Sequence, residues 1–151
     1  MILKIKHFAV LSVFLLQGCV QPPEGSELGR DFYRGSVATM TERIATYSIA
    51  DQWEIYYYGT TSIHPPDYTL SVPLARNGEP MALYIMSYLD SSREDHYFLN
   101  SLDVLERMVY RKYYDYCQNP SIIAKLNANQ SLIKDAFWRD FYGEKRTRMP
   151  C

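Results

Sequence analysis

The sequence predicts an all-α protein: a compact bundle of about five to six helices in antiparallel hairpins, with one disulfide and a flexible N-terminal tether. Apolar residues recur three and four positions apart along most of the chain, which places them on one face of a helix. Serine, aspartate and asparagine, which cap helix starts, precede several of these segments. No segment alternates with period two for long enough to predict a strand, and Tyr68 to Val72 is only a weak candidate.

The first 18 residues have the layout of a secretory signal peptide, with Lys4 and Lys6 before an apolar run from Phe8 to Leu16. The run ends in Leu16-Gln17-Gly18-Cys19, which resembles the lipobox of bacterial lipoproteins. The resemblance implies cleavage before Cys19, a diacylglycerol on its thiol and a further acyl chain, such as palmitate, on its amino group. A transmembrane helix is the alternative, but the run is far shorter than the roughly 20 residues that span a bilayer. A second alternative is an ordinary signal peptide in which Cys19 is an incidental thiol.

The position after Cys19 carries Val20 rather than the aspartate that commonly retains lipoproteins at the inner membrane. We therefore expect anchoring in the outer membrane, facing the periplasm. Residues 19–35 are rich in proline and glycine and predict a lipidated tether without regular structure, and residues 36–151 predict a single helical domain. Cleavage would leave 14 basic and 17 acidic residues, a formal charge of −3, which argues against a nucleic-acid partner.

The first helical spacing runs from Val37 to Tyr47, and a capping-box pattern at Ser48 to Asp51 precedes the next. Gly59 is expected to end that helix. The following segment contains His64-Pro65-Pro66 and cannot be helical because proline forces its predecessor into an extended conformation. A short helix is possible over residues 71–76, stopped by Asn77-Gly78.

Two longer helices follow. Pro80 suits a first helical turn and precedes one apolar stripe; a second stripe, from Phe98 to Tyr113, predicts a helix reaching about Tyr116. Their short connection predicts an antiparallel hairpin, and residues 80–116 resemble a HEAT-type repeat unit. The pattern departs from that family because Asn100-Ser101-Leu102-Asp103 replaces the usual small residues of its second helix. No second copy follows, so the resemblance implies stacked helical hairpins and not a solenoid.

The last third of the chain predicts two more helices. Asn119-Pro120 combines a cap with a first-turn proline, and Asp135 caps a final helix that should present Phe137, Trp138, Phe141 and Tyr142 to the core and begin to end near Gly143. With Cys19 lipidated, Cys117 and Cys151 remain as a pair, and the periplasm is oxidising, so we expect a disulfide between them. The cysteines and histidines have no metal-ligand spacing, and we expect neither a metal nor a cofactor.

The candidate partner-binding residues are Tyr58, His64 and Asp67, because a loop stiffened by two prolines presents aromatic and polar groups at a low entropic cost. Core packing for the neighbouring tyrosines is the alternative. His64, Asp67 and Ser71 also have the residue types of a hydrolase triad, but no Gly-x-Ser-x-Gly motif surrounds the serine, and no catalytic residue is assigned.

The sequence therefore predicts a non-enzymatic lipoprotein that binds a protein partner in the envelope, and one concrete version is an immunity or inhibitor protein. Two alternatives stay open: a structural or assembly accessory of an envelope or secretion apparatus, and a hydrolase that uses the His64 region.

Overall fold

The computed structural model describes residues 26–91 and 94–151, and within these ranges it contains helices and no strand, which confirms the all-α prediction. Short 3-10 turns extend or join several of the helices. The α-helices are α1 (Ser26–Tyr33), α2 (Met40–Arg43), α3 (Ile49–Thr61), α4 (Ser71–Ala75), α5 (Glu79–Ser91), α6 (Asp95–Tyr110), α7 (Pro120–Asn129) and α8 (Ala136–Thr147). More helices are present than the five or six expected because short segments such as α1 and α2 are also helical.

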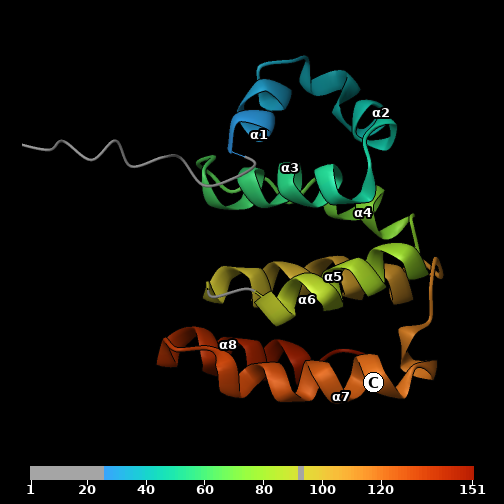
Figure 1. Ribbon diagram of the computed structural model, residues 1–151, viewed down its shortest axis with the longest axis vertical. Helices are drawn as coiled ribbons and strands as arrows, with labels where there is room; N and C mark the ends of the chain where they lie inside the picture. Colours follow the sequence, from blue (N-terminus) through green and yellow to red (C-terminus); the bar gives the residue numbers. More distant parts are fainter. Residues whose placement is uncertain (1–25, 92–93) are drawn as a thin grey trace, which may run out of the picture.

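The helices stack in layers along the long axis of the molecule (Figure 1). α1 and α2 lie at one end above α3 and α4; α5 and α6 form the middle layer, and α7 and α8 form the other end. α5 and α6 are the predicted antiparallel hairpin. α6 contacts α3, α4, α5 and α8, and every residue from Phe98 to Leu105 is buried, so α6 is the centre of the core.

Side-chain caps fix several helix starts as predicted. The Ser48 hydroxyl accepts from the backbone N–H of Asp51 at the start of α3, and the Asn119 side chain accepts from two N–H groups of α7. Asp135 caps α8 in the same way. Each cap satisfies N–H groups that have no partner within the helix, which contributes about 1 kcal/mol. Gly78, with φ of 59°, separates α4 from α5 in the left-handed conformation that glycine adopts most readily.

The predicted tether is wrong over its second half. Residues 26–33 form α1, which packs along α3, and Phe32 is 1% exposed. The close approach depends on Gly29, where a Cβ atom would overlap the Tyr58 side chain. Proline and glycine content suggested a linker, but glycine here permits helix contact. The signal peptide, Cys19 and the rest of the tether, residues 1–25, lie outside the described residues.

Two predicted helix ends are wrong for a related reason. Gly59 and Gly143 lie inside α3 and α8, where the neighbouring side chains of Tyr33 and Gln130 occupy the space that a Cβ would need. α6 in turn ends at Tyr110, earlier than expected, because the chain turns at Lys112 with φ of 58°. The sequence Ser92-Arg93-Glu94-Asp95 is a capping-box pattern before α6, and its first two residues lie outside the described residues.

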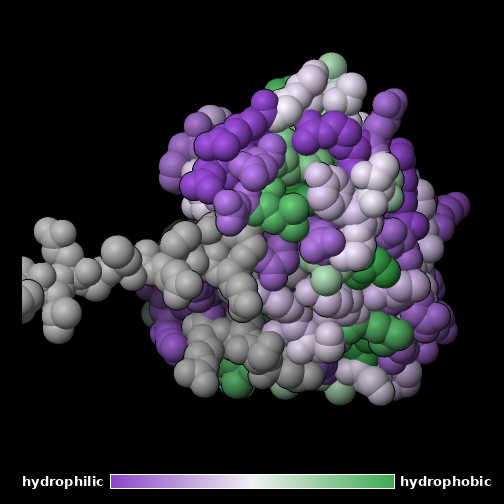
Figure 2. All heavy atoms as spheres, turned by 45° about the horizontal axis from the view of Figure 1, so that its top comes forward, coloured by the Kyte–Doolittle hydropathy of each residue, from purple (hydrophilic) through white to green (hydrophobic). Residues whose placement is uncertain are grey.

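Three aromatic residues expected in the core are exposed: Tyr113 beyond the end of α6, and Phe137 and Phe141 on α8. Tyr142 is the residue of α8 that is fully buried, and its hydroxyl donates to the Leu126 carbonyl of α7. The face that carries α1 and α2 is mainly hydrophilic, with hydrophobic residues in separate patches (Figure 2). In the described part of the chain, no helix is long and apolar enough to span a bilayer.

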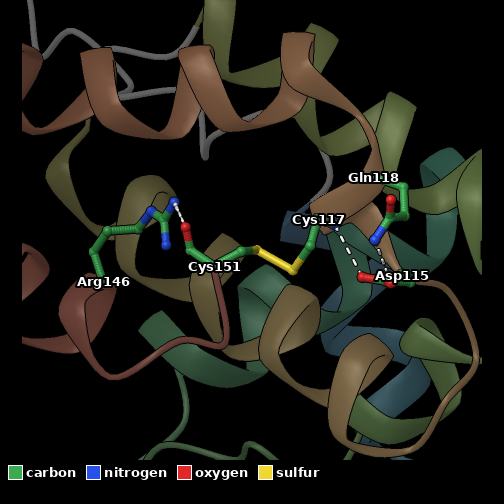
Figure 3. Close-up of a disulfide and its surroundings, with 5 residues drawn as sticks. All are labelled: Asp115, Cys117, Gln118, Arg146 and Cys151. Carbon is green, nitrogen blue, oxygen red and sulfur yellow. Dashed lines mark hydrogen bonds between the residues drawn. A yellow bond between two sulfur atoms is a disulfide. The ribbon is translucent and has the colours of Figure 1, made fainter.

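The predicted disulfide joins Cys117 to Cys151, with 5.6 Å between their Cα atoms. It links the turn before α7 to the segment after α8 (Figure 3). Asp115 accepts from the backbone N–H of Cys117 and from the Gln118 side chain, and the Arg146 guanidinium donates to the Cys151 carbonyl. The disulfide holds the C-terminal segment against the α6–α7 connection, and the hydrogen bonds order the chain on each side of it.

Candidate functional site

A cleft of about 630 Å³ opens where α3, α6 and α8 meet the loop that follows α3. We call this feature the cleft. Its lining residues are Tyr57, Thr60 and Thr61 from α3; His64, Pro66 and Tyr68 from the loop; Glu94, just before α6; His96, Leu99, Asn100 and Asp103 from α6; and Trp138, Phe141 and Lys145 from α8. Four aromatic rings and two carboxylates therefore face one space. The volume of this space is within the range of ligand pockets.

Polar side chains that are bonded to one another form one side of the cleft. The Asn100 amide donates to the Thr60 hydroxyl at 2.8 Å, and Thr60 donates to the Tyr57 carbonyl. Asn100 and Asp103 are both buried and lie three residues apart, so they project from the same face of α6. This pairing gives a buried polar surface whose groups are already oriented before any ligand arrives.

Asp103 connects three helices. Its carboxylate accepts from the hydroxyl of Tyr56 on α3 at 3.2 Å and lies 3.5 Å from the Lys145 ammonium of α8. Arg107 is 3.9 Å away on α6, and Lys145 also pairs with Glu106 at 3.8 Å. Burial first, and then the Asp103 charge, raise the pKa of Tyr56 well above its ordinary value, so that hydroxyl remains a donor. The cluster fixes α8 relative to α3 and α6 and thereby sets the width of the cleft.

An aromatic residue and an acid, Tyr57 and Glu94, lie together in the cleft lining. The Tyr57 hydroxyl donates to the Glu94 carboxylate, and the Tyr57 ring stacks on Tyr97 at 3.8 Å between centroids. Burial, followed by the bond to Glu94, raises the pKa of Tyr57 above its ordinary value, so the phenol stays neutral and keeps donating. On the opposite wall, Trp138 packs edge-on against His96 at 5.1 Å.

The N-termini of α6 and α8 are joined next to the cleft. The Asp95 carboxylate accepts from the backbone N–H groups of Lys134 and Asp135 at 3.0 and 2.9 Å. Desolvation acts to raise the pKa of Asp95, but the two backbone bonds and the Lys134 charge outweigh it and leave the pKa below its ordinary value. Both Asp95 and Asp135 therefore serve as helix-start carboxylates that keep the two cleft walls in register.

The structure separates the predicted site residues. His64 is exposed and lines the cleft, whereas Tyr58 and Asp67 do not. Tyr58 faces α1, with its ring 6.0 Å from that of Tyr33. Asp67 accepts from the N–H of Thr69, and its charge adds to the effect of burial in raising the pKa of Tyr33. The proline-stiffened loop thus presents His64 to the cleft and turns Asp67 toward α1.

The residues of the hydrolase alternative do not converge. Ser71 is buried at the start of α4, donates its hydroxyl to the Tyr68 carbonyl and does not line the cleft with His64. In the described ranges, no group of three or more histidine, cysteine, aspartate or glutamate side chains could hold a metal ion.

Asp103, Asn100, Trp138 and Lys145 are cleft residues that the sequence did not single out. A signal for two of them was present: Asn100 and Asp103 interrupt the apolar stripe of α6 with helical spacing, which predicts a polar surface facing neighbouring helices. Comparison with protein-family models, curated proteins and solved structures found no match to this chain.

Proposed function

We propose that this chain is a non-enzymatic lipoprotein, anchored through Cys19 in the bacterial outer membrane, that faces the periplasm and binds a protein partner in its cleft. The lipobox-like tetrapeptide supports the anchor, and the disulfide is the kind of bond that persists in an oxidising compartment. An immunity or inhibitor protein that neutralises an envelope-acting toxin is one concrete form of this function.

The observation that carries the proposal is the exposed aromatic surface of α8, two residues of which, Trp138 and Phe141, line the cleft. Phe141 is 44% exposed, and its ring lies parallel to that of Phe137, which is 66% exposed. Trp138 packs against both. Soluble proteins rarely leave contiguous apolar surface uncovered unless it binds something, and aromatic residues are enriched in interface cores. The hollow beside this surface offers a place for side chains of a partner.

The anchor is tested by replacing the modified residue. We expect Cys19→Ser to abolish incorporation of labelled palmitate and to release the protein from the membrane fraction, because without the thiol no diacylglycerol can be attached. Metabolic labelling and membrane fractionation measure both effects. A Cys151→Ser variant, which removes a cysteine elsewhere, should still take up the label. Continued labelling and membrane association of the Cys19 variant would refute the anchor.

The cleft is tested by removing exposed groups that line it. We expect Phe141→Ala and His64→Ala to remain folded, with stability changes within about 0.5 kcal/mol, because both side chains are exposed. Each should reduce recovery of the partner when the immobilised mature domain is incubated with envelope extract, as quantified by mass spectrometry against the parent protein.

Leu83→Ala is the matched control, because Leu83 is 50% exposed on α5 and does not line the cleft. This variant should recover the partner as the parent does. Equal recovery by all three variants would show that the cleft is not the binding site, and early melting of the cleft variants would show that these side chains support the fold instead.

A further inference from the structure

The charges around the cleft favour a cation. Lys145 is the one lysine or arginine among the lining residues, and its ammonium is shared between Asp103 and Glu106. Glu94, also in the lining, accepts from the Tyr57 hydroxyl and has no ion-pair partner among the described residues. The lining thus holds two carboxylates and one ammonium that is already paired, and among the described residues no cation pairs with Glu94.

The aromatic rings act in the same direction. The face of a tyrosine or tryptophan ring attracts a cation, by about 0.5–1 kcal/mol at exposed sites and more where water is excluded. Tyr57, Tyr68 and Trp138 line the cleft together with Glu94. A planar guanidinium can stack on such a ring while it donates two hydrogen bonds to a carboxylate. An acidic or purely aliphatic group would leave Glu94 repelled or without a counter-charge.

From these two observations, and resting on the proposed function, we infer that the cleft receives a basic side chain of the partner, an arginine or a lysine, between its aromatic walls and the Glu94 carboxylate. The volume of the cleft is large enough for the long side chain and for part of the backbone that carries it. The apolar stem would lie against the aromatic rings, as long basic side chains do on apolar surfaces. The partner is thereby defined as a protein that presents an exposed basic residue at its contact surface.

The test uses small blocked amino acids as probes of the mature domain. Nitrogen-15 NMR titrations at low salt with N-acetyl-arginine amide and N-acetyl-lysine amide should shift the signals of Trp138, Thr61 and Asn100 in a saturable manner. N-acetyl-glutamine amide and N-acetyl-glutamate amide, which are of similar size but neutral or acidic, should not. Glu94→Gln should weaken arginine binding about two- to fivefold, the effect of one partly exposed ion pair.

Glu27→Gln is the matched control, because Glu27 is an exposed acid on α1 remote from the cleft lining, and it should bind the arginine probe as the parent does. Glutamine keeps an acceptor for the Tyr57 hydroxyl, so Glu94→Gln should stay folded. Equal binding of the neutral probe, unchanged affinity in Glu94→Gln, or shifts outside the cleft would each overturn the inference. In the partner-capture experiment, loss of the partner with Phe141→Ala together with its retention by Glu94→Gln would contradict the cation inference alone. Retention of the partner by both variants would contradict the proposed function.

Discussion

Replacing Cys117 and Cys151 together by alanine is expected to lower the free energy of unfolding by about 4 kcal/mol. The bond closes a loop between residues 34 positions apart, and a loop of this length restricts the unfolded chain by about that amount in the chain-entropy description. For a domain of this size, the loss corresponds to a fall in melting temperature on the order of 10 °C. Urea unfolding and calorimetry of the parent and the double variant measure both quantities.

The parent protein kept reduced is the internal control for this prediction. It should unfold like the double variant, because both lack the same constraint, and the oxidised parent should show no free thiol at Cys117 or Cys151. A loss smaller than about 1 kcal/mol would show that other contacts, such as the burial of Met149 in the core, hold the C-terminal segment without the bond.

Asp103→Ala is expected to destabilise the domain by about 3 kcal/mol, because removing one member of a buried charged cluster leaves its partners uncompensated. The Tyr56 hydroxyl, which is fully buried, would lose its acceptor, and Lys145 would keep only Glu106. Urea unfolding at neutral pH measures the change. The result would show that α3, α6 and α8 are held together by this carboxylate as well as by apolar packing.

Tyr56→Phe separates the hydrogen bond from the ion pairs, since it removes the donor and leaves the carboxylate with Lys145. Tyr56→Phe should lower the free energy of unfolding by about 1 kcal/mol. The double variant of Tyr56→Phe and Asp103→Ala should lower it by less than the sum of the two single variants, because the residues interact directly. Strict additivity, or a change below about 1 kcal/mol for Asp103→Ala, would contradict a structural role for the cluster.

Local chemistry explains why much of the fold could be predicted. Ser48, Asn119 and Asp135 start helices through bonds to N–H groups a few residues away, and such signals are complete within the sequence. Gly29 and Gly59 misled the prediction because their role depends on Tyr58 and Tyr33, which are far away in the chain. A glycine that admits a neighbouring helix has the same appearance in sequence as a glycine that ends one.

The cleft was harder to anticipate for the same reason. His64 was singled out because of the prolines beside it, but its neighbours in the cleft come from three other segments. Phe137 and Phe141 follow helical spacing that predicts burial, and only the position of α8 at one end of the stack leaves them exposed. Periodicity identifies which residues share a face of a helix, whereas the tertiary arrangement decides whether that face is covered.

Under the proposed anchoring at Cys19, the inclusion of α1 in the folded domain limits how far that domain can lie from the bilayer. Only six residues, 20–25, separate Cys19 from Ser26, where α1 begins. A chain spans at most about 3.5 Å per residue, so seven intervals allow a reach of roughly 25 Å from a lipid at Cys19 to the helix. A domain anchored through so short a segment would stay close to the bilayer surface, and its local concentration there would be correspondingly high. Encounters would therefore favour partners that are themselves at the membrane surface over those diffusing through the bulk of the compartment.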